Sequence, residues 1–259
     1  MFGSLSAGIM KRLVLAITLG LAAAPAGAHD VTIWPEQSAE PVQLKLRLGD
    51  PGDYVRIDKT HCAELVVSDS KGVKIDFRRD LEALDDKTLG TPNLRLGDWP
   101  SGTYVVSGRY DNGLYVHDAE NRAIATTKEW YPDSIDSAHY LKFSKAMFHI
   151  GASTGGFDRV VGHRLEFVPL ADPFAEKGTA TLPVKVLFDG MPLTAHIVEV
   201  GDETASSKGP RVTTDLNGIV QVKLDHKGWY RLAVDHRAPS KYPELFAFDD
   251  YTASLVFRR

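Results

Sequence analysis

The residue with the clearest capacity for metal chemistry is His29, which stands in the short stretch AGAHD. It follows a Lys-Arg pair, an apolar run from Leu13 to Ala24, and the small residues Ala26-Gly27-Ala28. A positive start, an apolar middle and a small-residue end are typical of a secretory signal peptide. The sequence therefore predicts that residues 1–28 are removed and that His29 becomes the first residue of an exported, periplasmic protein.

A histidine at a free N-terminus offers two nitrogen donors to one metal ion, the α-amine and the ring Nδ1, which close a six-membered chelate. An α-amine has a pKa of about 7.7 to 8.0, so a metal displaces its proton at little cost near neutral pH. A second imidazole facing the chelate would complete a three-nitrogen set suited to copper or nickel. The rival N-terminal motif, with histidine at the third position, is absent because Val31 would stand there.

Four of the other histidines are candidates for the second imidazole: His61 in KTHC, His117 in YVHDAE, and His139 and His149 in SAHYLKFSKAMFHIG. No pair among them has a ligand spacing such as HxH or HxxxH, so the choice stays open. The predicted metal ligands are His29, His61, His117 and His149. The remaining histidines are expected on the surface without a function: His163, His196, His226 and His236.

Composition restricts the other classes of protein. Without residues 1–28, 28 basic side chains oppose 34 acidic ones, which gives no support for nucleic-acid binding. Cys62 is the only cysteine, so no internal disulfide can form, and a single cysteine is usually a small buried apolar residue. The leader's apolar run is shorter than the roughly 20 residues of a membrane span, and no comparable run follows. We expect no span after cleavage.

Enzyme motifs are not evident. The stretch GASTGG places Ser153 among glycines, but it lacks the spacing of a GxSxG nucleophile elbow and the closing Lys-Ser/Thr of a phosphate loop. Adjacent acidic pairs such as Asp249-Asp250 do not place two carboxylates across a substrate. The sequence therefore predicts a protein that is not an enzyme.

The elements that must position these residues are strands. The stretch Val42 to Leu48 alternates apolar and polar side chains, which is the pattern of a strand with one wet face. Further strands are expected at 63–67, 73–77, 103–110 and 114–117, separated by turn sequences such as GDPGD and YDNG. A short helical insertion is expected at 79–88. Short strands with frequent turns favour an all-β fold.

The sequence pattern changes after Gly162. The following residues, about 95 in number, have the pattern of closely spaced strands, with a turn at Asn217-Gly218. This length is usual for an immunoglobulin-like or transthyretin-like sandwich. The predicted organisation is a signal peptide (1–28), an N-terminal β-sandwich-like domain (29–165) and a C-terminal sandwich (166–259).

The stretches LEFVPLADPFAEKGTATLPVKVLFDGMPLTAHIVEV, TTDLNGIVQVKL, GWYRLAVDH and YTASLVF resemble the DUF4198 family of exported bacterial proteins, as does the start AHDVTIWPE. The resemblance implies a periplasmic β-sandwich protein, because that family is grouped with periplasmic components of cobalt and nickel uptake systems. Only His29 is carried over as a candidate functional position.

Two functions follow as expectations. The first is a periplasmic protein that binds or delivers nickel, cobalt or copper, in association with membrane metal-transporter components. The second is a metal-free β-sandwich module that recognises an envelope protein or glycan. The fold by itself does not separate them.

Overall fold

The computed structural model describes residues 29–36, 42–91, 99–152, 155–175, 180–202 and 209–259. The predicted signal peptide and Ser153 lie outside the described residues. The strands are β1 (Val31–Glu36), β2 (Gln43–Asp50), β3 (Asp53–Val55), β4 (Cys62–Ser68), β5 (Lys74–Asp76), β6 (Glu82–Asp85), β7 (Thr88–Gly90), β8 (Gly102–His117), β9 (Ala123–Ile124), β10 (Asp136–Ile150), β11 (Leu165–Pro169), β12 (Thr181–Phe188), β13 (Met191–Pro192), β14 (Ile197–Gly201), β15 (Arg211–Thr213), β16 (Ile219–Lys223), β17 (Trp229–Pro239) and β18 (Phe248–Arg258). Two 3₁₀ turns, η1 (Lys59–His61) and η2 (Arg78–Asp80), complete the elements.

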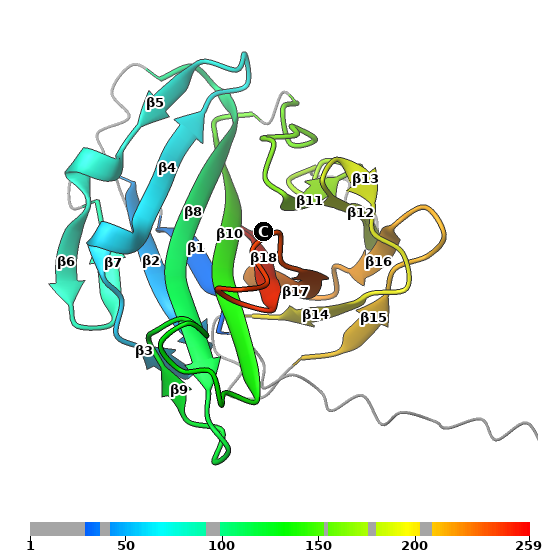
Figure 1. The fold of residues 1–259 in the computed structure, drawn as a ribbon. Helices are drawn as coiled ribbons and strands as arrows, with labels where there is room; N and C mark the ends of the chain where they lie inside the picture. The colour runs from blue at the N-terminus through cyan, green and yellow to red at the C-terminus, as the bar shows by residue number, and fades with distance from the viewer. Residues whose placement is uncertain (1–28, 37–41, 92–98, 153–154, 176–179, 203–208) are drawn as a thin grey trace, which may run out of the picture.

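A large sheet forms the centre of the molecule (Figure 1). Within the described residues it has nine strands, in the order β15-β14-β17-β18-β10-β8-β4-β5, with β9 paired to β8. The pair β10–β18 is parallel, whereas its neighbours β8 and β17 pair antiparallel to β10 and β18. The boundary predicted at residue 165 falls on the first residue of β11. Strands from both sides of it belong to one sheet, because β10 pairs with β18.

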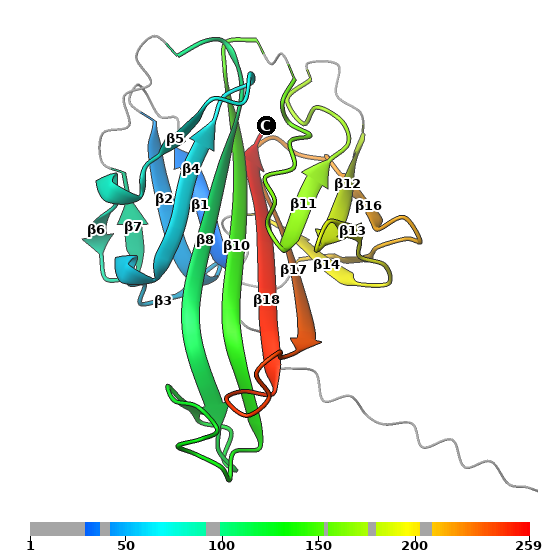
Figure 2. The same ribbon diagram turned by 45° about the horizontal axis from the view of Figure 1, so that its top comes forward.

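Two smaller sheets cover the central one. The first contains β1, β2, β7, β6 and β3, and the second contains β11, β12, β13 and β16. In Figure 2, β1 and β2 lie behind β4 and β8, whereas β11 and β12 lie over the other end of the central sheet. The all-β prediction, with sandwich packing of sheets, is confirmed.

The central strands are buried on both faces. Val105, Met147 and Leu255 belong to the hydrophobic cluster under the second small sheet. Their chain neighbours Val106, Phe148 and Val256 belong to the cluster under the first. Since successive side chains of a strand point to opposite faces, the two clusters occupy opposite sides of the same sheet. This explains why β8 and β10 contain runs of consecutive buried residues instead of an alternation.

Several predicted strands are confirmed. The alternation at 42–48 corresponds to β2, whose leucines are buried while the intervening residues are half-exposed. The predictions at 63–67 and 73–77 correspond to β4 and β5, and the Asn217-Gly218 turn precedes β16, with Gly218 at a φ of 71°. In β2 and β4 the local pattern agrees with the burial, whereas the residues of β5 are exposed.

Two local predictions are wrong. The stretches 103–110 and 114–117 belong to one strand, β8, because the intervening DNG forms a β-bulge and not a turn. The register moves from Asp111 opposite Leu141 to Gly113 opposite Tyr140, so Asn112 is the extra residue. The helical insertion expected at 79–88 is only the single turn η2 followed by β6 and β7.

Candidate metal and ligand-binding sites

His29 lies directly before β1, and the chain around it is held on two sides. Its carbonyl oxygen accepts a hydrogen bond from Nζ of Lys142 on β10. The carboxylate of Asp30 forms an ion pair with Arg231 on β17, and its carbonyl accepts a hydrogen bond from Gly49 N at 2.9 Å. The backbone at the predicted mature N-terminus is therefore fixed against the central sheet and β2.

The ring of His29 has an unused nitrogen. Its Nδ1 is buried and makes no hydrogen bond within the described part of the chain. A buried polar atom without a partner costs about 1–3 kcal/mol. Nδ1 is the ring nitrogen that the N-terminal chelate expected from the sequence would use.

Buried charges surround this start of β1. Burial raises the pKa of Asp30 to about 6, against the opposing effects of the Arg231 and Lys142 cations. Burial also lowers the pKa of Lys142 to about 8, while Asp30 is the strongest influence in the other direction. The cluster keeps its charges because each cation has an anion beside it.

The structure does not bring the predicted partners together. Among the described residues, no group of three or more His, Cys, Asp and Glu side chains is arranged to hold a metal ion. On β8, Thr103 pairs with His149 at one end and His117 pairs with Asp136 at the other. Fourteen residues of strand separate these ends by roughly 45 Å, so His117 and His149 do not share one ion.

The individual partners have defined contacts. Nδ1 of His117 donates to Oδ1 of Asn121 at 3.0 Å, and its Nε2 accepts from the Tyr140 hydroxyl at 3.3 Å. The ring of His149 packs 4.8 Å from that of Phe174. Of these two histidines, His117 lies nearer the start of β1. Lys142 Nζ, which donates to the His29 carbonyl, lies over the ring of Tyr140, and the Tyr140 hydroxyl contacts His117.

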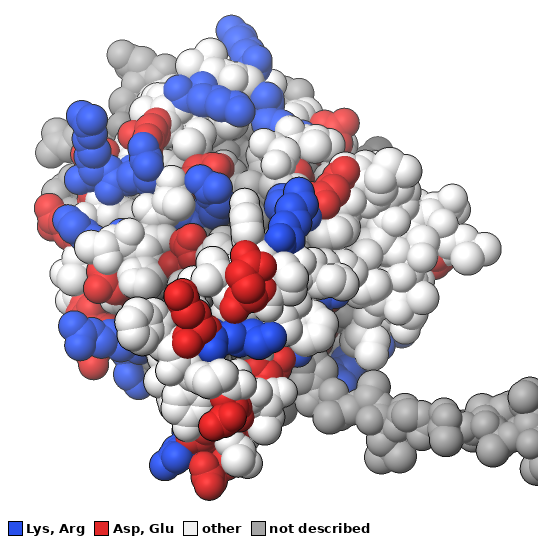
Figure 3. Space-filling model, in the orientation of Figure 1, with Lys and Arg blue, Asp and Glu red and all other residues white. Residues whose placement is uncertain are grey.

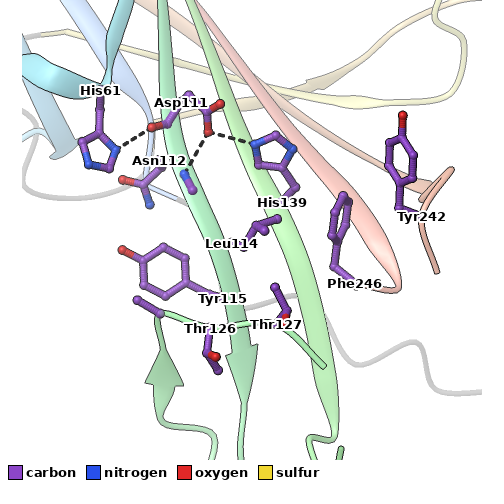
Figure 4. Close-up of a pocket in the computed structure, with 12 residues that line it drawn as sticks. His61, Asp111, Asn112, Leu114, Tyr115, Thr126, Thr127, His139, Tyr242 and Phe246 are labelled. Atoms are coloured by element: carbon purple, nitrogen blue, oxygen red, sulfur yellow. Dashed lines mark hydrogen bonds and ion pairs between the residues drawn. The ribbon is translucent and has the colours of Figure 1, made fainter. Parts of the chain in front are cut away.

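His61 meets another histidine at Asp111 (Figure 4). Nδ1 of His61 donates to the Asp111 carbonyl at 2.6 Å, and Nε2 of His139 lies 2.8 Å from the Asp111 carboxylate. The other nitrogen of His139, Nδ1, is 3.7 Å from Asp249. The His61 ring therefore presents Nε2 as its acceptor nitrogen, while His139 is held between two carboxylates.

His61, Asp111 and His139 line an open cavity of about 620 Å³. The bulge at Asn112 places Leu114 opposite His139, and both residues line the cavity. Polar and aromatic side chains dominate the lining, and none is Lys or Arg: His61, Asp111, Asn112, Leu114, Tyr115, Thr126, Thr127, His139, Tyr242 and Phe246, with Gly113 and Ala125. On the face shown in Figure 3, acidic side chains predominate over the lower half, and basic ones gather toward the upper left.

The rim of the cavity is tied together. Lys128 N donates to the Leu245 carbonyl at 2.9 Å, and Lys128 Nζ donates to that of Pro243 at 3.3 Å. The Phe246 ring contacts His139 edge-on at 5.6 Å. Two loops that are far apart in sequence thus form one preformed wall, which is the usual state of a small-ligand pocket.

The remaining candidates behave differently. Cys62 is half-buried, and burial raises its pKa to about 11, so it remains a thiol at neutral pH. The surface expectation is wrong for His163, which is buried and whose Nε2 lies 3.3 Å from Glu64. His196 and His236 are half-buried and contact each other, which the sequence spacing did not indicate.

A family model described as a domain of unknown function, DUF4198, matches residues 26–238. The chain belongs to the DUF4198 family. The matched region begins three residues before His29 and ends after His236, so it includes all nine histidines of this family member. Comparison with curated proteins gives no match. The described part of the chain contains no helix with the length and hydropathy of a membrane span.

Proposed function

We propose that this DUF4198 protein is a non-enzymatic, exported protein that binds a transition metal at His29 after signal cleavage. The observation that carries the proposal is the buried Nδ1 of His29, which lacks a partner among the described residues and follows a cleavage pattern by one residue. Cleavage after Ala28 supplies the α-amine, and the two nitrogens then close a chelate. Nickel, cobalt and copper all accept such nitrogen donors.

A two-nitrogen site leaves coordination positions open. Lys142 and Gly49 fix the main chain at the start of β1, so the chelate is held in one orientation. Open positions suit a delivery protein, because ligands of a receiving protein can join the ion before it leaves. The partners in this proposal are membrane components of a metal transporter, and the site of action is the periplasm.

The test compares three forms of the chain in equilibrium titrations with Ni(II), Co(II) and Cu(II). The first begins at His29, the second keeps Ala26-Gly27-Ala28, and the third begins with Gln in place of His29. Keeping three residues matters, because one or two would place His29 where an amine and backbone nitrogens form their own copper site. We expect affinity to fall by about tenfold or more in the second and third forms. Equal affinity in all three would refute the proposal.

A second function is favoured by the cavity. Aromatic faces beside amide and hydroxyl groups, with no Lys or Arg side chain in the lining, suit an uncharged ligand such as an envelope glycan. In this alternative the chain is a metal-free recognition module. Titration with soluble envelope oligosaccharides in chelator tests it. Binding that Asn112→Ala and Phe246→Ala weaken, and that His29→Gln does not, would support it, whereas no heat of binding would exclude it.

A further inference from the structure

His196 and His236 are cross-strand neighbours at one end of the central sheet. Strands β14 and β17 pair antiparallel with Val198 opposite Val234, and continuing this register by two residues places His196 opposite His236. Both valines are buried in the core. Because side chains alternate between faces, the two histidines lie on the same inward face, where the core meets solvent.

The hydrogen bonds define which nitrogens carry protons. Nδ1 of His196 lies 2.8 Å from the carbonyl oxygen of Thr194, which can only accept, so Nδ1 carries the proton. Nε2 of His196 is therefore an acceptor, and Nδ1 of His236 donates to it at 2.9 Å. A histidine that donates its other N–H to a backbone carbonyl has the orientation usual for metal ligands.

The backbone holds this arrangement in place. His196 N donates to Oγ1 of Thr214 at 2.9 Å, and Thr214 N donates back to the His196 carbonyl at 2.9 Å. The ring of Phe188, from the facing small sheet, packs 4.2 Å from the His236 ring. Both rings are thus positioned before any ion arrives, and both remain half-exposed.

The nearby charges permit a cation. Asp189 and Asp235 attract positive charge at His236, whereas Arg164 repels it. Arg164 is itself neutralised by Asp189, which accepts its Nε–H at 2.7 Å.

We propose that His196 and His236 form a second transition-metal site, independent of the N-terminus, for a square-planar ion such as Cu(II) or Ni(II). Two nitrogens bound at about 2.0–2.1 Å and at a right angle lie about 2.8–3.0 Å apart, against about 3.3 Å at a tetrahedral ion. The hydrogen-bonded nitrogens are already 2.9 Å apart, so a square-planar ion that replaces the shared proton leaves their separation unchanged. On binding, the ion takes the lone pair of His196 Nε2 and displaces the Nδ1 proton of His236, which moves through water to Nε2 of the same ring.

The test uses the form that keeps Ala26-Gly27-Ala28, in which the N-terminal chelate cannot form. Titration with Cu(II) is expected to show one bound ion per chain. His196→Gln and His236→Gln should each weaken its binding by about tenfold or more, while His226→Gln, an exposed histidine of the same half, should leave it unchanged. Equal affinity in all four chains would overturn the proposal without bearing on the site at His29.

A spectroscopic measurement covers the case in which a variant does not fold. Electron paramagnetic resonance of the Cu(II)-loaded, unsubstituted form should show coupling to two imidazole nitrogens. A spectrum with no nitrogen coupling would overturn the proposal. If the form that begins at His29 binds two ions and the form that keeps Ala26-Gly27-Ala28 binds one, the difference reports only on the N-terminal site.

Discussion

The hydroxyl oxygens of Ser144 and Ser254 lie 2.9 Å apart across the parallel pair β10–β18, where both side chains are buried. Ser254 donates to the Val31 carbonyl at 2.7 Å, and Ile33 N donates to Ser144 at 3.1 Å. Because Ser254 uses its proton on β1, Ser144 must donate to Ser254. The two serines thus form a continuous hydrogen-bond chain that fastens β1, the strand that begins beside His29, to the central sheet.

Removing either serine hydroxyl should destabilise the fold. We expect Ser144→Ala and Ser254→Ala each to lower the free energy of unfolding by about 1–3 kcal/mol, since each leaves a buried backbone group of β1 without its partner. The double variant should lose less than the sum, because the shared bond can be lost only once. Urea unfolding of the three variants measures these losses, and strictly additive losses would contradict the proposed chain of hydrogen bonds through the two serines.

The buried pair of Lys145 and Glu166 should be sensitive to loss of one partner. Lys145 Nζ is 2.5 Å from Glu166, whose carboxylate also accepts hydrogen bonds from Val161 N and Gly162 N. Burial lowers the pKa of Lys145, which shows the cost of holding its charge there. Glu166→Gln should cost about 3–5 kcal/mol of unfolding free energy by leaving that charge unpaired.

The matched control for this pair is Lys145→Met combined with Glu166→Gln. The double variant should be more stable than Glu166→Gln alone, because no unpaired charge remains in the core. Thermal and urea unfolding both report it. A loss below about 1 kcal/mol for Glu166→Gln would mean that the pair is worth no more than an exposed one.

Stability at low pH should depend on Glu64. The hydrogen bond from His163, aided by that from Ser107 at 2.7 Å, lowers the pKa of Glu64 to about 2 from its usual 4.5. The unfolded chain therefore binds the proton more readily, so the stabilisation is present above about pH 4.5 and is lost as pH falls through about 2. Glu64→Gln should cost about 1–2 kcal/mol near pH 6 and little near pH 2. A constant difference across that range would disprove this role.

The buried indole of Trp34 depends on Thr32. Its Nε1 donates to Oγ1 of Thr32 at 2.9 Å, and both side chains are fully buried. Thr32→Val keeps the shape and removes the acceptor, so unfolding free energy should fall by about 1–3 kcal/mol. Thr181→Val, at an exposed strand position, is the control and should change stability by no more than about 0.5 kcal/mol. Equal effects of the two substitutions would contradict this assignment.

Local pattern predicted the strands that have one wet face, such as β2, but not the connection of β8 across DNG. Asp-Asn-Gly is a turn sequence when its flanks are free to reverse. Here Gly113 at a φ of 87° allows a bulge, and β10 pairs with the strand on both sides of it. Sheet pairing therefore overrides the turn signal, and pairing between distant segments is not encoded in a local window.

The candidate sites show the same limit. His29 could be proposed from the sequence because its expected chemistry depends only on adjacent residues and one cleavage rule. The pairing of His196 with His236 depends on the β14–β17 register across 40 residues of sequence. His61 and His139 meet only because both contact Asp111 from different elements. A motif based on sequence spacing can detect candidate ligands that lie on one element. It cannot detect side chains that strand pairing brings together from distant parts of the sequence.

The position of β18 between β10 and β17 affects how the chain must fold. Ala138 pairs with Phe248, so β10 gains this neighbour only after another 110 residues have been synthesised. Until then, β10 is an edge strand of the apolar β8–β10 pair, and its unpaired backbone groups can pair with other chains. Contacts of such large sequence separation form slowly. A chaperone that shields β10 during this interval would raise the yield of native protein more than one acting on β2 or β12, whose partners lie closer in sequence.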